Sequence, residues 1–203
     1  MTGRLPRGRH GLSRAEVATQ QRGRIVRALA EELAERGYVD TPVSAVLRRA
    51  GVSRETFYEQ FASKQDCFVA ALEQAVGELG DRLAAVLAGA TGPPLERLSL
   101  LLDGYLDALA GQPALARLFL VETYAAGPAA MRRRLELQQS FVDAVAELLG
   151  GPVARPAATA LVAAAIGLVT AWFAPGGAES GDLAQVLDPV LDLAAAWLGR
   201  AGT

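Results

Sequence analysis

Residues 41–61 read TPVSAVLRRAGVSRETFYEQF. This stretch predicts two short helices, the first beginning at Thr41-Pro42 and the second at Ser53, with Gly51 in the turn between them. Helices this short are marginal in water on their own, so neighbouring helices must hold them in place. Two short helices joined by a tight turn that contains glycine form a helix-turn-helix.

The second short helix carries the side chains that suit DNA. In a helix-turn-helix it lies in the major groove, and its N-terminal residues contact base edges and phosphates. Arg54 can bind guanine with two hydrogen bonds, and helical spacing turns Tyr58 outward, one turn after Arg54. Ser53 and Thr56 lie in the first turn near the free N–H groups, and Lys64 can add a phosphate contact at the start of the next helix.

The rest of the chain also predicts helices. Apolar residues make up 51% of the 203 residues, Ala and Leu dominate, and runs of Val, Ile and Thr with a period of two are missing. The expected fold class is therefore all-α. The single cysteine, Cys67, leaves no pair for a disulfide and fits a reducing, cytoplasmic location. Because His10 is the one histidine, we expect no metal site, no cofactor and no histidine-dependent catalysis.

Charge is divided unevenly along the chain. Residues 1–64 contain twelve Lys and Arg against seven Asp and Glu, whereas residues 65–203 contain eight against fifteen. A basic front on an acidic body is typical of a protein whose front binds a polyanion, here double-stranded DNA. The alternative is chance together with a tag-like arm, since Arg4, Arg7 and Arg9 alone supply three positive charges.

Glycine and proline divide the chain into three parts. Residues 1–12 combine glycine, proline and arginine, and we expect a disordered basic arm. Residues 13–64 begin with a capping box at Ser13 and form a three-helix domain that contains the helix-turn-helix. Residues 65–203 form a larger helical domain, joined to the first through a long fourth helix that ends near Leu87. Further helices are expected near 94–110, 112–126, 128–149, 156–173 and 182–199, with breaks that include Gly150-Gly151-Pro152 and Pro175-Gly176-Gly177.

The stretch from Gly37, GYVDTPVSAVLRRAGVSRETFYEQFASKQDCF, resembles the DNA-binding region of the TetR family of bacterial transcriptional regulators. The resemblance covers about residues 13–70. Its motifs, in order and at the family's spacing, are Gly37-Tyr38, the Thr41 cap, Ala50-Gly51-Val52-Ser53, Phe57-Tyr58, Phe61 and Ser63-Lys64. The resemblance implies DNA contacts by Thr41, Ser53, Arg54, Thr56, Tyr58 and Lys64, with Arg48 as a further contact to the DNA backbone.

The resemblance also implies a homodimer, in which the last two large helices form a four-helix bundle with the partner's pair. A single recognition helix reads only a few base pairs, so such proteins pair to bind two half-sites. The last two helices offer an apolar surface, with small residues spaced four apart that allow close approach. The candidate dimer-interface residues are Ala163, Gly167, Ala171, Val186, Val190, Leu191 and Leu198.

By the same resemblance, the helices between the two ends enclose a pocket for a small-molecule effector. Most aromatic residues at helical spacing are simply core, so the alternative for each candidate is a packing role. Such pockets are largely apolar with few polar groups, which favours a hydrophobic ligand. The candidate ligand-binding residues are Tyr105, Phe119, Glu122, Thr123, Tyr124, Gln138, Phe141, Trp172 and Phe173.

Two further segments allow more than one interpretation. Residues 157–174 contain no charge over eighteen residues, which reaches the lower limit for a membrane span. We favour a helix buried between protein helices, and no membrane is expected as a partner. The run Arg132-Arg133-Arg134 is expected to be a solvated helix start.

The expected function is a homodimeric repressor that binds a palindromic operator and is released by a small hydrophobic ligand through a population shift. Three alternatives stay open: an all-helical enzyme that uses carboxylates such as Asp103 and Glu122, an interaction module with a vestigial helix-turn-helix, and a TetR-like activator. An enzyme is disfavoured because the sequence has no phosphate-binding loop and no usable pair of His and Cys.

Overall fold

The computed structural model of the chain describes residues 13–150, 154–174 and 182–201, and the regular elements within them are helices. The all-α fold class is therefore confirmed. The basic arm at residues 1–12 lies outside the described residues, as do the expected breaks at Gly151-Pro152 and Pro175-Gly176-Gly177.

Helix α1 (Arg14–Arg36) begins as the local sequence predicts. The Ser13 hydroxyl accepts the N–H of Glu16, and the Glu16 carboxylate accepts the N–H of Ser13, which completes the capping box. The helix packs on α2, on α4 and on the segment around residues 113–122. Its buried stripe includes Ile25, Leu29 and Leu33.

Helices α2 (Val43–Ala50) and α3 (Arg54–Gln60) form the expected helix-turn-helix. Gly51 ends α2 with a φ of +64°, a left-handed conformation that glycine adopts without a steric penalty. Ser53 caps α3, because its hydroxyl accepts the N–H of Thr56 at 3.0 Å.

The start of α2 differs from the prediction. Pro42 takes the N-cap position without a side-chain hydrogen bond, and Thr41 is fully buried. The Thr41 hydroxyl instead lies 2.7 Å from the carbonyl of Gly37 and 3.3 Å from that of Glu32, near the end of α1. A buried hydroxyl needs a partner, and these carbonyls supply it. The prediction that Thr41 caps α2 is therefore wrong.

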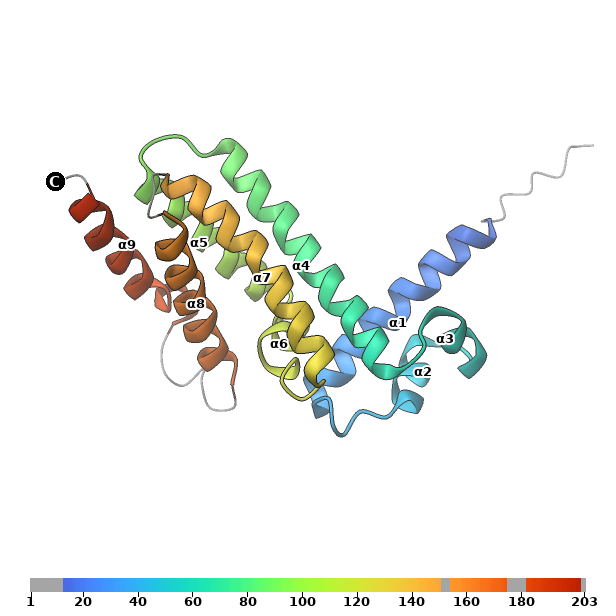
Figure 1. The fold of residues 1–203 in the computed structure, drawn as a ribbon. Helices are drawn as coiled ribbons and strands as arrows, with labels where there is room; N and C mark the ends of the chain where they lie inside the picture. Colours follow the sequence, from blue (N-terminus) through green and yellow to red (C-terminus); the bar gives the residue numbers. More distant parts are fainter. Residues whose placement is uncertain (1–12, 151–153, 175–181, 202–203) are drawn as a thin grey trace, which may run out of the picture.

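Helix α4 (Lys64–Gly89) runs from the helix-turn-helix into the body of the molecule, as Figure 1 shows. The Ser63 hydroxyl caps it by accepting the N–H of Asp66 at 3.0 Å. The helix packs on α1 and also on α5 and α7. This one helix therefore contacts both the helix-turn-helix domain and the body.

Cys67, in the first turn of α4, offers a test of this packing. Its side chain is buried, and burial raises the pKa of the thiol to about 12. Because the thiolate is the reactive form, we expect Cys67 in the folded protein to resist dithionitrobenzoate at mildly alkaline pH and to react once guanidinium unfolds the chain. Rapid, stoichiometric reaction of the native protein would contradict the packing of α4.

The body is built from four longer helices and a short irregular segment. The expected single helix near 112–126 is instead a short helix, α6 (Pro113–Arg117), followed by one π-helical turn, η1 (Leu118–Glu122), and by turns. A π-helical turn is rare and often marks a functional position. The longer helices are α5 (Pro94–Gly111), α7 (Pro128–Leu149), α8 (Ala154–Phe173) and α9 (Asp188–Ala201), with a 3-10 turn, η3 (Leu183–Gln185), before α9.

Helix α8 is apolar, yet it packs into the body along one face. By length and composition it could cross a membrane, and 28% of its most apolar window is buried. The buried residues include Leu161, Val162, Ala165 and Val169, and the exposed small residues include Ala163, Gly167 and Ala171. The expectation of a helix buried between protein helices is thus met on one face, and the other face is open in the single chain.

Candidate DNA interface and ligand cavity

Helix α3 turns two side chains outward from a buried base. Phe57, and Phe61 just beyond the helix, are buried in the core. On the outer face Tyr58 is 46% exposed, and the exposed Arg54 places its guanidinium carbon 5.7 Å from the centroid of the Tyr58 ring. An exposed guanidinium and an exposed phenol are groups that can contact a base edge and a phosphate.

Three further predicted contacts lie on the same part of the chain. The Ser53 hydroxyl lies 2.9 Å from the Thr56 hydroxyl as well as accepting the Thr56 N–H, so the pair organises the first turn of α3. Arg48, near the end of α2, is exposed. The structure therefore groups Arg48, Ser53, Arg54, Thr56 and Tyr58 in the two helices of the motif.

Two predicted DNA contacts turn inward instead. Thr41 is fully buried, so its side chain cannot reach DNA. The Lys64 ammonium donates to the carbonyls of Tyr38 at 2.7 Å and Thr41 at 2.9 Å, and it lies 4.0 Å from the centroid of the Tyr38 ring. Partial burial lowers the pKa of Lys64. Lys64 therefore holds the loop between α1 and α2 against α4 rather than presenting a free cation to phosphate.

The sequence reasoning missed the clamp made by Arg49. Its guanidinium contacts the carboxylates of three residues on α1, at 2.7 Å from Glu32, 2.6 Å from Glu35 and 3.4 Å from Glu31. These hydrogen bonds, first of all the one that Arg49 donates to Glu35, raise the pKa of Arg49. The clamp fixes α2 on α1. It directs the side chain of Arg49 toward α1, whereas the neighbouring Arg48 is exposed.

A buried junction joins the helix-turn-helix to the body. Glu122, at the end of η1, is 6% exposed, and its Oε2 accepts the backbone N–H of Tyr38 at 2.7 Å. Its Oε1 lies 3.6 Å from Nε of Arg117. Beside this contact, Gln65 at the start of α4 donates to the carbonyl of Ala126 at 2.7 Å. Glu122, which the sequence placed in the ligand pocket, instead fixes the end of α1 to the body.

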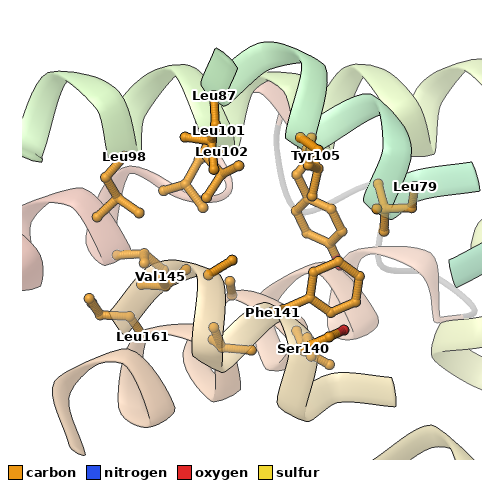
Figure 2. A pocket seen from close by; sticks show the side chains of 18 of the residues that line it. Leu79, Leu87, Leu98, Leu101, Leu102, Tyr105, Ser140, Phe141, Val145 and Leu161 are labelled. Atoms are coloured by element: carbon orange, nitrogen blue, oxygen red, sulfur yellow. The ribbon is translucent and has the colours of Figure 1, made fainter. Parts of the chain in front are cut away.

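An apolar cavity of about 300 Å³ lies in the body, lined by α4, α5, α7, α8, α9 and Phe119 of η1. Figure 2 shows Tyr105 and Phe141 on one side of it and Leu98 on the other. Tyr105 and Ser140 contribute hydroxyl groups to a lining that is otherwise apolar. The volume is at the lower end of the range of about 300–1,000 Å³ that small-molecule sites occupy.

Three of the nine predicted ligand residues line this cavity, namely Tyr105, Phe119 and Phe141. The prediction is wrong for the others as cavity residues. Tyr124 is exposed, and the Thr123 hydroxyl bonds the carbonyls of its own turn. Trp172 and Phe173 pack edge to face on each other at the end of α8. The residues outside the lining are Glu122, Thr123, Tyr124, Gln138, Trp172 and Phe173.

The candidate dimer residues divide in a similar way. Val190 is 1% exposed and lines the cavity, so its assignment to an outer surface is wrong. Packing of α9 on α5 and α8 turns this residue inward. The remaining candidates are exposed or half-buried in the single chain: Ala163, Gly167, Ala171, Val186, Leu191 and Leu198.

The carboxylates of the enzyme alternative do not form a site together. Asp103 on α5 is exposed, whereas Glu122 is buried and contacts Tyr38 and Arg117.

The helix-turn-helix is the part of the chain that matches a known protein family. Residues 25–71 match the family model described as bacterial regulatory proteins, tetR family. The helix-turn-helix part of the chain therefore belongs to the TetR family.

Relatives that match this chain by sequence are named as transcriptional regulators. The chain is 25% identical over 159 residues to the HTH-type transcriptional activator FasR of Mycolicibacterium smegmatis, a match that covers 75% of this chain and 72% of the relative. It is 31% identical over 93 residues to the fatty acid metabolism regulator protein of Bacillus subtilis, covering 45% of this chain and 47% of the relative.

The whole fold also has solved counterparts. The structure of the transcriptional regulator FadR from Bacillus subtilis in complex with stearoyl-CoA superposes with a TM-score of 0.74. That match covers 85% of this chain and 96% of the other, at 22% identity. At this identity the likeness establishes the shared fold.

Proposed function

We propose that this TetR-family regulator is a homodimeric repressor that binds a palindromic operator and is released by a ligand with a long apolar chain. The observation that carries the DNA-binding part is the outer face of α3, where Arg54 and Tyr58 are exposed on a helix held from below by Phe57. Arg48, Ser53 and Thr56 complete the proposed contact surface of residues 13–64.

The cavity supports the choice of ligand. Its walls consist largely of leucine, valine and alanine side chains, which suit a hydrocarbon chain. FadR of Bacillus subtilis shares the fold and was solved in complex with stearoyl-CoA, and the Bacillus subtilis relative found by sequence is named as a fatty acid metabolism regulator protein. An apolar chain in this cavity is therefore the proposed effector, and catalysis is not part of the proposal.

The junction at Glu122 supports a route from the cavity to the DNA. Phe119 lines the cavity, and three residues later on the same π-helical turn Glu122 holds the N–H of Tyr38. Lys64, the first residue of α4, holds the carbonyl of Tyr38. A ligand that displaces Phe119 would move this junction and change the spacing of the two recognition helices.

Such a ligand acts only through its different affinity for the two states. A typical coupling of about 1–3 kcal/mol would lower the affinity for DNA by about 5- to 150-fold. In this proposal, binding of the operator by α3 and binding of the ligand in the cavity are thermodynamically linked through the junction at Glu122.

DNA binding is tested by titrating the protein against the DNA upstream of its own gene, using fluorescence anisotropy at two salt concentrations. We expect saturable binding to a palindromic segment that weakens steeply with salt, because neutralised phosphates release counterions. Absence of any specific site, upstream or in a genome-wide selection, would contradict the proposal and favour an interaction module with a vestigial motif.

A second candidate function is transcriptional activation, which the printed name of the mycobacterial relative favours. An activator would bind operator DNA through the same surface. A transcription assay with purified polymerase distinguishes the two, because a repressor lowers the transcript yield in the absence of ligand.

Dimerisation through α8 and α9 yields a sharp prediction at Gly167. No atom lies within 4 Å of a Cβ built at Gly167 or at Gly77, apart from the local backbone, so both sites have room for a larger side chain in the single chain. If α8 packs closely on its partner, Gly167→Leu overpacks the symmetric interface twice, at about 1–3 kcal/mol per copy.

We therefore expect analytical ultracentrifugation to show Gly167→Leu as a monomer, or as a dimer at least about 10-fold weaker than the native one. Gly77→Leu, on the exposed face of α4, is the matched control and should leave the dimer intact. A Gly167→Leu dimer as tight as the native protein would place the interface elsewhere.

A further inference from the structure

Arg134, on α7, is a buried cation. The sequence predicted a solvated residue, but its side chain is among the buried ones, with 4% exposure, whereas its neighbour Arg132 is exposed. The guanidinium carbon lies 5.2 Å from the centroid of the Phe119 ring and 5.0 Å from that of the Tyr124 ring. Among the described residues no carboxylate pairs with Arg134, and its buried Nε has no hydrogen-bond partner.

A buried cation without an anion is costly, because its lost hydration is not replaced. Cation–π attraction to the electron-rich faces of the two aromatic rings offsets part of that desolvation penalty. They do not accept the in-plane hydrogen bonds of the guanidinium, whose fork of N–H donors matches a carboxylate. The Nε of Arg134 is thus a buried donor that lacks an acceptor among the described residues.

Tyr105, on α5, is a second buried donor without a partner. Its ring lines the cavity, and its hydroxyl is buried with no hydrogen-bond partner among the described residues. Burial raises the pKa of Tyr105 and the nearby charge of Arg134 opposes that rise, so the phenol is a neutral donor at physiological pH. Buried polar groups are normally hydrogen-bonded, and this one belongs to a residue that lines an otherwise apolar cavity.

Phe119 connects the two unpartnered donors. It lines the cavity beside Tyr105, and Arg134 lies against its ring. The cavity wall includes leucines of α4 and α5 and the ring of Tyr105, as Figure 2 shows. Arg134 is outside the lining, in contact with the ring of Phe119. An apolar chain that ends in a carboxylate complements both features.

We propose that the effector is a free carboxylic acid with a long apolar chain, whose carboxylate binds Tyr105 and Arg134 at the Phe119 end of the cavity. This inference rests on the proposed function, since it places the effector in the same cavity. An alcohol of equal chain length fits the apolar wall but brings no anion to Arg134. A CoA thioester lacks the carboxylate at the end of its acyl chain, and its phosphates lie at the far end of the pantetheine arm. The carboxylate draws the guanidinium past Phe119, which moves the π-helical turn that carries Glu122.

The test compares three probes of one chain length, decanoate, 1-decanol and decanoyl-CoA, by isothermal titration calorimetry. We expect decanoate to bind the native protein at least about 10-fold more tightly than the other two, in line with a hydrogen bond to a charged group. Arg134→Met should weaken decanoate binding by about 10- to 100-fold and leave decanol binding unchanged. Tyr105→Phe should weaken decanoate binding by about 2- to 10-fold.

Arg132→Met removes an exposed neighbouring charge from the same helix and is the matched control, with no expected change. Thermal unfolding separates a folding defect from a binding defect. Because the native Arg134 charge is unpaired, Arg134→Met should be as stable as the native protein or more so.

Equal binding of decanoate and decanol, unchanged decanoate binding by Arg134→Met, or binding of none of the three probes would overturn the proposal. Release of DNA, measured in parallel, separates it from the proposed function. If decanol releases DNA as well as decanoate does, the cavity controls DNA binding but the carboxylate site is wrong. If decanoate binds through Arg134 and DNA stays bound, the carboxylate site stands and the proposed release fails.

Discussion

Arg54→Ala is expected to weaken binding to the operator by about 30-fold or more. A bidentate contact between arginine and guanine discriminates by about 1–3 kcal/mol, and a dimer loses it in both half-sites. The structure supports this size of effect because Arg54 is exposed on the outer face of α3, so its replacement removes a contact without disturbing the core. Fluorescence anisotropy with the operator and with a scrambled duplex measures the loss.

The control for Arg54→Ala is Arg82→Ala, which removes an exposed charge from α4 in the body. It should leave the affinity for DNA unchanged. If Arg54→Ala weakens binding to the operator and to the scrambled duplex equally, and lowers the slope of log affinity against log salt concentration by about one, Arg54 contacts phosphate rather than a base. An affinity equal to that of the native protein for both duplexes would remove α3 from the interface.

Glu122→Ala is expected to destabilise the protein by about 2–3 kcal/mol, because hydrogen bonds to a charged group are worth about 1.5–3 kcal/mol and their buried partners lose an acceptor. The N–H of Tyr38 would lose its contact at 2.7 Å, and Arg117 would lose its carboxylate. The side chain of Arg117 is 33% exposed, so water compensates part of its loss. Urea unfolding at neutral pH measures the change.

The matched control is Glu136→Ala, which also removes a glutamate paired with an arginine. Its partner is Arg133 at 2.9 Å, and both side chains are exposed to solvent. Surface pairs of this kind contribute at most about 1 kcal/mol. Equal losses for the two variants would mean that the Glu122 junction is no stronger than a surface contact, and the proposed route from cavity to DNA would lose its mechanical basis.

Local rules predicted the elements of this fold well. The caps at Ser13 and Ser53 and the turn at Gly51 depend on residues close in sequence, and α1 to α4 begin and end near the expected positions. The segment expected as one helix at 112–126 and the late start of α9 at Asp188 are the exceptions. Thr41 misled the prediction because the tertiary contact with the end of α1 outweighs the local preference for a cap.

The cavity could be predicted only in part. Aromatic character in the sequence correctly indicated Tyr105, Phe119 and Phe141, but nothing in the sequence indicated the leucines that form much of the wall. A leucine that lines a cavity and a leucine in a packed core have the same helical spacing. Which of them faces empty space depends on the distances between helices, and these are set by packing rather than by sequence pattern.

The junction between the two parts was not visible in the sequence at all. Glu122 binds the N–H of a residue 84 positions earlier in the chain. The charge run at 132–134 gave no sign that Arg134 turns inward to Phe119 and Tyr124, while Arg132 stays outside. A run of equal charges predicts a solvated face, and only the rotation of α7 against its neighbours distinguishes one arginine from the next.

The most direct test of the central claim is the anisotropy of labelled operator DNA, half saturated with the native protein, during a titration with decanoate. We expect the DNA to be released as the acid fills the cavity, with a fall in affinity of about 5- to 150-fold. Calorimetry on the same samples confirms occupancy of the cavity. An affinity for DNA that is unchanged or higher while the acid is bound would contradict the proposed release of DNA by the ligand.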